Sequence, residues 1–575
     1  MKNFKETANF IWSIADLLRG DYKQSDYGKV VLPLTVLRRL DSVLEKTKAD
    51  VLAKYEQVKT MNVQNIDPLL NKVSGFKFHN RSPYTFDKLI ADPENIAANL
   101  RNYINGFSED AREIIEQFEF DNQITKMDDN NLLFMIVKRF QEVDLHPDKV
   151  SSMEMGYLFE ELIRKFAEIS NETAGEHFTP REVIRLMIDL LFLNDRDILT
   201  QKGIVKTIYD CCAGTGGMLS VAEEYLNELN PDARLEVFGQ ELNPESYAIC
   251  KSDMIIKGQS AANIKKGNSI SEDKLPGEHF DYLITNPPFG VKWQKIEKTV
   301  KEEHASKGHG GRFGAGLPSV SDGSFLFLMH LMSKMKPVSE GGSRLAIVFN
   351  GSPLFSGSPS TSKNESSIRQ WIIENDMLEA VVALPNQLFY NTGISTYIWI
   401  ISNHKPNYRK GKVQLINAVD FFKKMSKSLG DKRNELAPDH IAEITKLYGE
   451  FTTGEYCKIF DNADFGYAKV TVERPERDKN GKPKLDKNGK PKADSSLRDT
   501  ENIPLKEDIQ TYMEREVLPH VPDAYVDDSK TKVGYEINFT KYFYQYKPLR
   551  SLADIRADIL ALETETMGLI KTVIE

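Results

Sequence analysis

Apolar residues recur at two different spacings along this chain, and the change between them divides it. In residues 1–150 the apolar positions follow helical spacing, and residues 31–40 are apolar almost throughout, which predicts a buried helix. The clearest helical run comprises Phe10, Ile14, Leu17 and Leu18. We find no catalytic constellation here, so residues 1–150 are interpreted as a helical domain that docks or clamps a substrate.

From residue 151 the pattern changes to short apolar strands that alternate with helical stretches, with glycine and proline turns between them. The strands are expected at residues 205–209, 235–239, 282–285, 345–349, 380–384 and 396–401. This alternation predicts an α/β fold with a doubly wound, Rossmann-like sheet, mostly parallel, over residues 151–470. Ligands of such sheets bind outside the carboxyl ends of the strands, so the residues that end each strand are the ones to inspect.

Residues 471–500 are polar and rich in lysine, and they contain a tandem repeat at 478–484 and 486–492. Each copy includes Asn-Gly, a strong signal for a tight turn, so each copy is expected to turn back on itself. A solvated insertion is the favoured interpretation. The alternative is a contact with the DNA backbone or with a partner protein.

The C-terminal segment, residues 501–575, ends in a helical stripe with spacings of three and four residues. Its members are Leu552, Ile555, Ile559, Leu562, Leu569 and Val573, with Thr566 as the polar break. Such a stripe is typical of a short coiled coil. It can pack on its own chain or bind a helix of a partner, and the sequence favours neither.

The strand at residues 282–285 ends in the tetrapeptide Asn286-Pro287-Pro288-Phe289. Neither proline has an N–H to donate to a sheet, so the strand is expected to stop there. The Asn286 side-chain oxygen and the Pro287 carbonyl can then face one exocyclic amine, while Phe289 can stack on a planar ring. The arrangement suits an amino group on a flat heterocycle, such as adenine N6.

A glycine loop, residues 210–219, follows the strand at 205–209 directly. It is neither a Walker loop nor a dinucleotide fingerprint, because Leu219 stands where the third glycine belongs. A small zwitterionic ligand is compatible with it, with Asp210 for the ammonium group and backbone amides for the carboxylate. A lone Gly-x-Gly is more often only a tight turn.

Three further positions surround this loop. Glu241 ends the next strand, where an acid can bind both hydroxyls of a ribose. Asn268 offers a donor and an acceptor to an adenine edge. Upstream, Thr179 is predicted to cap a helix with Pro180 at its first position and Glu182 at its third, which is a capping box. A contact of Thr179 with the ligand is the alternative.

The net charge of −9 and the pI near 5.8 argue against a protein that grips nucleic acid unaided. If the protein binds nucleic acid, either its basic surface is confined to a small area or a partner protein provides most of the binding. The four cysteines show neither metal spacing nor a disulfide framework. Without a signal-peptide core or an apolar run of membrane-spanning length, we expect a cytoplasmic protein with no membrane contact.

Taken in order, these motifs resemble those of amino-group DNA methyltransferases of the gamma arrangement. More narrowly, the chain resembles the modification subunit of type I restriction–modification systems. The motifs are Phe-Thr-Pro-Arg at 178–181, Asp-x-x-x-Gly-x-Gly-Gly at 210–217, Glu241, the tetrapeptide at 286–289, and stretches at 321–327, 344–349 and 383–393. Two positions depart from the family: Cys211 stands where proline is common, and Asn268 where an acid is common.

The resemblance implies S-adenosylmethionine as the cofactor and adenine N6 in double-stranded DNA as the methyl acceptor. The catalytic residues would be Asn286, Pro287, Pro288 and Phe289, with Phe389 as a second face for base stacking and Tyr390 as its alternative. The cofactor would contact Glu176, His177, Phe178, Thr179, Pro180, Arg181, Asp210, Gly214, Thr215, Gly216, Gly217, Glu241 and Asn268. No metal is implied.

The resemblance also implies partners. These are a DNA specificity subunit, a second copy of this chain, and an ATP-dependent subunit for restriction and translocation, because this chain has no Walker loop. Three alternatives remain at this point. The same pocket can serve cytosine N4, an Asn-Pro-Pro site can serve a protein glutamine or an RNA guanine, and the chain can be a scaffold that binds cofactor without turnover.

Overall fold

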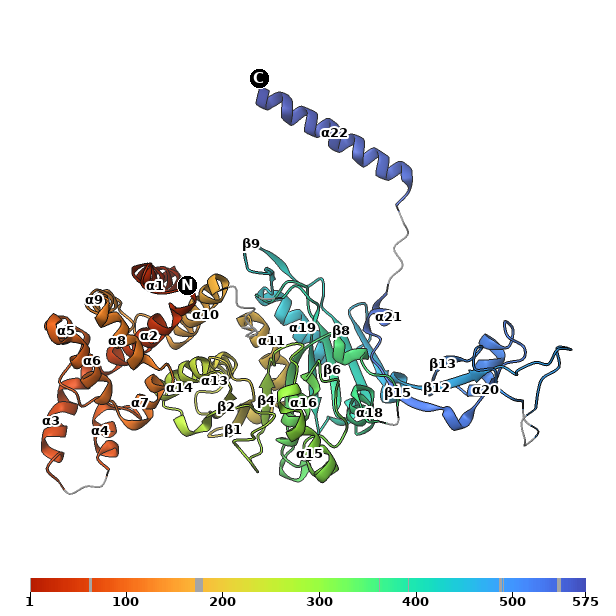
Figure 1. The fold of residues 1–575 in the computed structure, drawn as a ribbon, viewed down its shortest axis with the longest axis horizontal. Coiled ribbons are helices and arrows are strands. Elements are labelled where there is room, and N and C mark those ends of the chain that lie inside the picture. The colour runs from red at the N-terminus through yellow and green to blue at the C-terminus, as the bar shows by residue number, and fades with distance from the viewer. Residues whose placement is uncertain are drawn as a thin grey trace. The chain divides into compact units, whose positions relative to one another are not determined.

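The computed structural model describes residues 2–61, 65–170, 179–360, 362–390, 392–485, 489, 491–544 and 550–574. The chain forms two compact units, residues 1–537 and residues 538–575. Figure 1 shows helices at the N-terminal end of the first unit, followed by a large mixed sheet with helices packed on it. The predicted fold class is confirmed.

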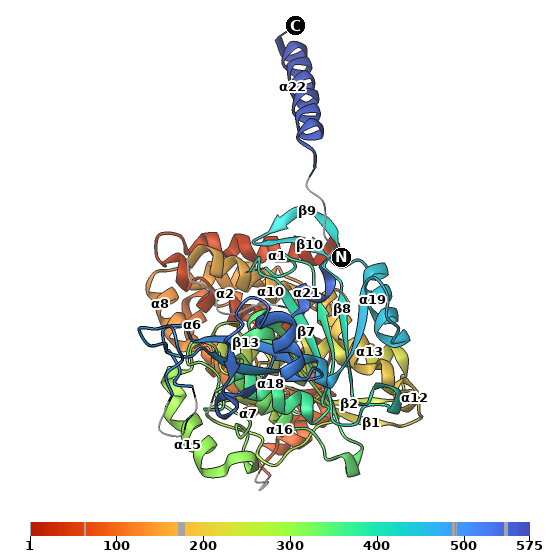
Figure 2. The same cartoon turned by 90° about the vertical axis from the view of Figure 1, so that its right-hand side faces the viewer.

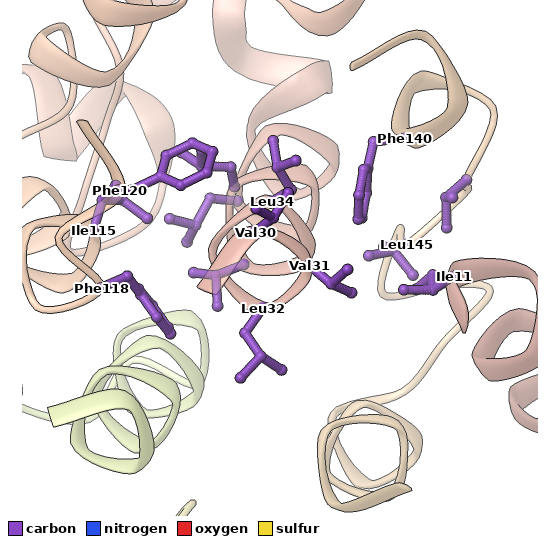
Figure 3. Packing of buried hydrophobic residues seen from close by; sticks show 14 of the residues in the cluster. Ile11, Val30, Val31, Leu32, Leu34, Ile115, Phe118, Phe120, Phe140 and Leu145 are labelled. Atoms are coloured by element: carbon purple, nitrogen blue, oxygen red, sulfur yellow. The ribbon is translucent and has the colours of Figure 1, made fainter. Parts of the chain in front are cut away.

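The N-terminal region is helical, as predicted. Its helices are α1 (Lys2–Ala15), α2 (Gly28–Leu44), α3 (Lys48–Val58), α4 (Asp67–Ser74), α5 (Phe86–Ile90), α6 (Ile96–Asn105), α7 (Glu109–Glu116), α8 (Phe120–Asp129), α9 (Leu133–Gln141) and α10 (Ser152–Ser170). Helix α2 is buried on nearly all sides, which explains its apolar sequence. Figure 3 shows its side chains Val30, Val31, Leu32 and Leu34 among Ile11, Ile115, Phe118, Phe120, Phe140 and Leu145.

Two later helices complete this N-terminal core. Leu158 and Leu162 of α10 are buried in it, and so are Ala248 and Ile249 of α14 (Pro244–Ile256). An ion pair of 2.6 Å between Lys251 of α14 and Glu113 of α7 crosses the same junction. The helical region is therefore packed directly against the part of the chain that carries the sheet.

The central sheet has the order β11-β8-β6-β7-β5-β4-β1-β2-β3. Its strands are β1 (Val205–Asp210), β2 (Arg234–Glu241), β3 (Ile264–Lys266), β4 (Tyr282–Thr285), β5 (Arg344–Asn350), β6 (Leu378–Ala383), β7 (Thr396–Ser402), β8 (Lys412–Asn417) and β11 (Cys457–Asp461). Pairing is parallel except where β7 pairs with β5 and β6, and β11 with β8. The six predicted strands are present, and β3, β8 and β11 were not predicted.

Helices cover both faces of this sheet. Those that follow α10 within the sheet region are α11 (Arg181–Phe192), α12 (Arg196–Leu199), α13 (Gly217–Leu229), α14, α15 (Glu297–Lys307), α16 (Ser324–Ser333), α17 (Ser352–Phe355), α18 (Glu365–Glu374) and α19 (Pro438–Glu450). One face buries Val348 and Ile398 beneath α11 and its neighbours. On the other face, Phe325 of α16 meets the ring of Trp399. Alternate residues of β5 and β7 thus face opposite layers.

A buried ionic cluster sits at the amino end of β5. The Arg344 guanidinium donates to both oxygens of Glu379, at 3.1 and 3.2 Å, and Arg409 lies 3.5 Å from the same carboxylate. All three side chains are almost fully buried. Burial alone favours a neutral carboxyl, but the two guanidinium groups hold the pKa of Glu379 below its usual value.

A smaller sheet follows the central one. It comprises β12 (Gly466–Glu473), β13 (Asp499–Pro504), β14 (Tyr525–Val526) and β15 (Lys532–Tyr535), and α20 (Ile509–Tyr512) lies between its strands in the sequence. The lysine-rich insert leaves from β12. Its first repeat turns back as predicted, with the Gly481 N–H donating to the Asp478 carbonyl at 3.0 Å. At the second repeat, its last residue Lys492 donates its N–H to the Lys484 carbonyl at 2.8 Å.

A separate two-stranded ribbon, β9 (Lys423–Leu429) and β10 (Lys432–Glu435), precedes α19. The second unit contains α21 (Phe539–Phe543) and α22 (Leu552–Ile574), and α22 carries the predicted apolar stripe. In that helix Leu552 and Leu562 are 85% and 62% exposed. None of the helices in the described part of the chain is both long enough and apolar enough to span a membrane.

The ionic cluster generates a prediction about stability. Glu379→Ala leaves two guanidinium groups buried without their counter-charge, so we expect the free energy of unfolding in urea to fall by about 3–5 kcal/mol. Glu302→Ala is the matched control, because its partner Lys298 lies 3.9 Å away and both side chains are exposed. That control should change stability by less than about 1 kcal/mol. Equal losses in the two variants would contradict the assignment.

Candidate active site

Three chemically important residues meet at the carboxyl ends of adjacent strands. β1 ends at Asp210, β2 ends at Glu241, and Asn286 follows the last residue of β4. β1 pairs in parallel with both β2 and β4, so these strand ends lie at one edge of the sheet. The chain order reverses between β1 and β4, and such a switch point is where α/β sheets bind ligands.

A cavity of about 520 Å³ opens at this edge. Among the predicted site residues, Gly214, Glu241, Asn268, Asn286 and Pro288 line it. A smaller recess of about 60 Å³ adjoins it and is lined by Thr179, Asp210, Gly214, Thr215, Gly217 and Asn286. The larger volume lies within the range of small-molecule sites. The structure thus brings together most of the predicted residues that it describes.

The glycine loop and the end of β2 are joined through Glu241. One carboxylate oxygen accepts the Gly214 N–H at 2.8 Å, and the other accepts the Asn243 N–H at 2.7 Å. Burial raises the pKa of Glu241, while these N–H groups favour its charged form. Each carboxylate oxygen has a second lone pair, so the residue can hold the loop and still accept from hydroxyl groups of a ligand.

Asp210 links the end of β1 to the end of β4. Its Oδ1 accepts the Thr285 hydroxyl at 2.7 Å and the Cys212 N–H at 2.9 Å. Burial raises the pKa of Asp210 to about 7, with the negative charge of Glu241 adding to the effect. The carboxyl group therefore titrates near neutral pH. A cationic group of a ligand would favour its charged form.

The tetrapeptide is oriented by an unexpected partner. Asn286 is buried, and its Nδ2 donates to Thr179 Oγ1 at 2.8 Å. The predicted capping box is therefore wrong: α11 begins at Arg181, and Pro180 occupies the N-cap without a side-chain hydrogen bond. A buried amide needs a hydrogen-bond partner, and the Thr179 hydroxyl meets that need. Glu182 pairs with Lys432 instead.

Arg181 lies behind the glycine loop. Its guanidinium forms a 2.6 Å ion pair with Glu160 of α10 and donates to the Gly217 carbonyl at 3.1 Å. A Cβ at Gly217 would lie 3.3 Å from Glu160 Oε1 and 3.4 Å from Arg181. The first turn of α13 is therefore held against α10. No local pattern pointed to Glu160, because its partner Arg181 is 21 residues away in the sequence.

The two aromatic residues predicted to stack on a base already contact each other. The rings of Phe289 and Phe389 lie 6.3 Å apart, edge to face at 69°. Phe389 is almost fully buried, whereas Phe289 and Tyr390 are half-buried. The loop that carries Phe389 is thus adjacent to the tetrapeptide, as the prediction requires. In this arrangement the rings are packed on each other.

Asn268 occupies a tight turn at the cavity wall. Its Oδ1 accepts the Ile270 N–H at 2.9 Å, which is an Asx turn. The turn is held from outside by Arg312, a residue that the sequence did not point to. Arg312 donates to the Ser269 and Ile270 carbonyls at 2.9 and 2.8 Å and pairs with Glu303 at 2.6 Å. Glu176, His177 and Phe178 lie outside the described residues.

Comparisons with known proteins agree with the two regions seen here. Residues 151–478 match the family described as N-6 DNA methylase, and residues 7–140 match the HsdM N-terminal domain. One relative is the type I restriction enzyme MjaIX methylase subunit of Methanocaldococcus jannaschii, 26% identical over 493 residues. The alignment covers 83% of this chain and 82% of that protein.

Solved structures show the same fold. The type I restriction–modification methyltransferase subunit of Streptococcus thermophilus superposes with a TM-score of 0.63 at 23% identity. The superposition covers 80% of this chain and 97% of the Streptococcus thermophilus chain. A chain from a type I restriction–modification system, solved in a study of complex assembly, gives a TM-score of 0.52 at 18% identity over 99% of this chain and 98% of its own.

The glycine loop generates a matched pair of variants. Gly216 has φ 86°, and a Cβ there would lie 2.9 Å from the Cys250 sulfur, whereas Gly214 has φ 53° and open space around the same position. Both alanine variants pay for backbone strain, and only Gly216→Ala adds a collision. We expect a larger drop in thermal unfolding midpoint for Gly216→Ala. Equal drops in the unfolding midpoint would show that the collision with Cys250 adds nothing to the loss of stability.

Proposed function

This chain belongs to the N-6 DNA methylase family, and from that membership we propose that it transfers a methyl group from S-adenosylmethionine to adenine N6 in DNA. It does so as the modification subunit of a type I restriction–modification complex. The observation that carries the proposal is the position of Asn286. Its side chain lies at the end of β4, lines the cavity beside the glycine loop, and is held by Thr179.

The residues around the cavity fit S-adenosylmethionine. Its amino-acid part carries an ammonium and a carboxylate, which suit Asp210 and the backbone amides of the glycine loop. Its ribose suits Glu241, whose oxygens border the cavity and retain accepting capacity. The wall at Asn268 and Leu242 would receive the adenine. When bound, the cofactor supplies a methyl group activated by a sulfonium.

The acceptor chemistry follows from the tetrapeptide. An exocyclic amine of adenine is a poor nucleophile, because its lone pair is conjugated with the ring. Hydrogen bonds from its two N–H groups to Asn286 Oδ1 and the Pro287 carbonyl would favour a pyramidal nitrogen and aim its lone pair at the methyl group. With Asn286 Nδ2 donating to Thr179, Oδ1 is the end of the amide that would accept from the amine. Catalysis is then orientation and charge stabilisation.

The base must leave the duplex to reach this pocket. We propose that it enters between Phe289 and Phe389. Stacking on an aromatic ring stabilises a base by roughly 1–3 kcal/mol. Because these two rings now meet edge to face, they must separate for a base to stack. Opening their contact would therefore be part of base entry.

The partners follow from charge and from α22. With a net charge of −9, the chain is poorly suited to hold DNA alone, so we propose that a specificity subunit supplies recognition and that two copies of this chain act with it. Leu552, Ile555, Ile559 and Leu562 of the α22 stripe are exposed, which favours a helix of a partner that packs on them. ATP-dependent translocation and restriction would reside in another polypeptide, and the complex would work in the cytoplasm.

Asn286→Ala tests the catalytic assignment. In the assembled complex we expect methyl transfer to DNA to fall by at least about 10²-fold, because the amine loses one acceptor, while cofactor affinity changes little. Asn375→Ala at the exposed end of α18 is the control and should keep the normal rate. Transfer rates come from incorporation of label from the cofactor, and cofactor affinity from calorimetry. A wild-type rate for Asn286→Ala would contradict the mechanism.

The pKa of Asp210, about 7, generates a pH dependence. Below that value the carboxyl is protonated in the free protein, so binding an ammonium group must first remove a proton. We expect cofactor affinity to rise from about pH 6 to 7.5, approaching tenfold per unit at the acid end. Asp210→Asn should flatten this dependence in calorimetry. A methylthioadenosine ligand, which lacks the ammonium, should show none, and the same slope for it would exclude Asp210 as the cause.

A further inference from the structure

The ribbon of β9 and β10 is a basic element on a chain of net negative charge. Residues 423–435, called the basic ribbon below, contain five lysine or arginine residues and two acidic ones. Lys423, Lys424 and Lys427 are exposed along β9. Figure 2 shows β9 and β10 extending from the body of the first unit. The ribbon therefore presents positive charge to solvent.

In the part of the chain that the structure describes, the exposed lysines of β9 have no ionic partner. Within the described residues, no carboxylate lies at ion-pair distance from Lys423, Lys424 or Lys427. The lysine-rich insert differs, because Glu476 forms ion pairs with both Lys484 and Lys492, at 2.5 and 2.6 Å. Exposed lysines that form no ion pair are what an anionic partner would recognise.

Strand β10 of the basic ribbon and the turn before it form hydrogen bonds with the loop that carries Phe389. The Asp431 N–H donates to the Tyr390 carbonyl at 2.8 Å, and the Arg433 N–H donates to the Gln387 carbonyl at 2.9 Å. Lys432, which is buried, donates to the Leu388 carbonyl at 3.0 Å. Three consecutive residues, 431–433, thus connect the ribbon to the loop by hydrogen bonds.

The turn of the ribbon is fitted to the same loop. Gly430 has φ 59°, and a Cβ there would lie 2.5 Å from the Tyr390 carbonyl oxygen. Glycine is therefore required for the ribbon to approach the loop this closely. Since Phe389 of that loop contacts Phe289 of the tetrapeptide, a continuous set of contacts leads from the exposed lysines to the candidate base pocket.

We propose that the basic ribbon binds the phosphate backbone of DNA beside the nucleotide that enters the pocket. This inference rests on the proposed function, because it takes DNA as the substrate. Lys423, Lys424 and Lys427 neutralise phosphates, and the bonds of β10 hold the Phe389 loop at a fixed position relative to that backbone. Extruding a base from the duplex costs free energy, and a backbone contact next to the pocket would offset part of that cost.

The test is the salt dependence of DNA binding by the complex of this chain with its specificity partner. The variant is Lys423→Gln, Lys424→Gln and Lys427→Gln together. Each lost phosphate contact lowers the slope of log Kd against log salt by about 0.9, so we expect the slope to fall by about 2–3 and the affinity near physiological salt to weaken. The matched control is Lys202→Gln, Lys410→Gln and Lys532→Gln, which removes the same charge from exposed lysines outside the ribbon and outside the helical region.

The inference stands if the ribbon variant lowers the slope and the control does not. It is overturned if the ribbon variant keeps the wild-type slope, or if the control lowers the slope equally. Unchanged cofactor affinity in calorimetry verifies that the ribbon variant is folded. Because the slope reports binding without methyl transfer, a wild-type complex that binds DNA and never methylates it would defeat the proposed function alone.

Discussion

The parallel pairing of β1 with β4 inside the sheet is the constraint on which the site depends. It places Asp210 at one strand end and Asn286 just beyond the other, and the Thr285 hydroxyl donates to Asp210 across the junction. The part of the cavity proposed for the cofactor and the part proposed for the base are therefore adjacent. The sequence separates these residues by 76 positions, and only the sheet brings them together.

Two buried contacts extend this arrangement to neighbouring elements. The bond between Thr179 and Asn286 connects the tetrapeptide to the segment before α11, and the ion pair between Arg181 and Glu160 connects the glycine loop to α10. Since α10 also packs in the N-terminal core, the helical region is mechanically joined to the pocket. A domain interpreted at first as a docking element thus contributes to the geometry of the site.

Sequence patterns predicted the layers and the strand ends, because burial period and proline or glycine turns are local signals. β3 was missed because it has only three residues, and β8 because it buries a polar residue, Gln414. The predicted capping box does not form because the Thr179 hydroxyl makes a tertiary contact with Asn286 instead. Glu160, Arg312 and Lys432 could not be found from local patterns, since their partners are distant in sequence and become neighbours only in the folded chain.

We propose above all that a cavity at the switch point presents Asn286 and the Pro287 carbonyl to adenine N6. Mass spectrometry of nucleosides tests it most directly, after DNA is incubated with the assembled complex and isotopically labelled S-adenosylmethionine. We expect label in N6-methyladenine. Label in N4-methylcytosine, or unlabelled DNA from a complex that binds both DNA and cofactor, would contradict it.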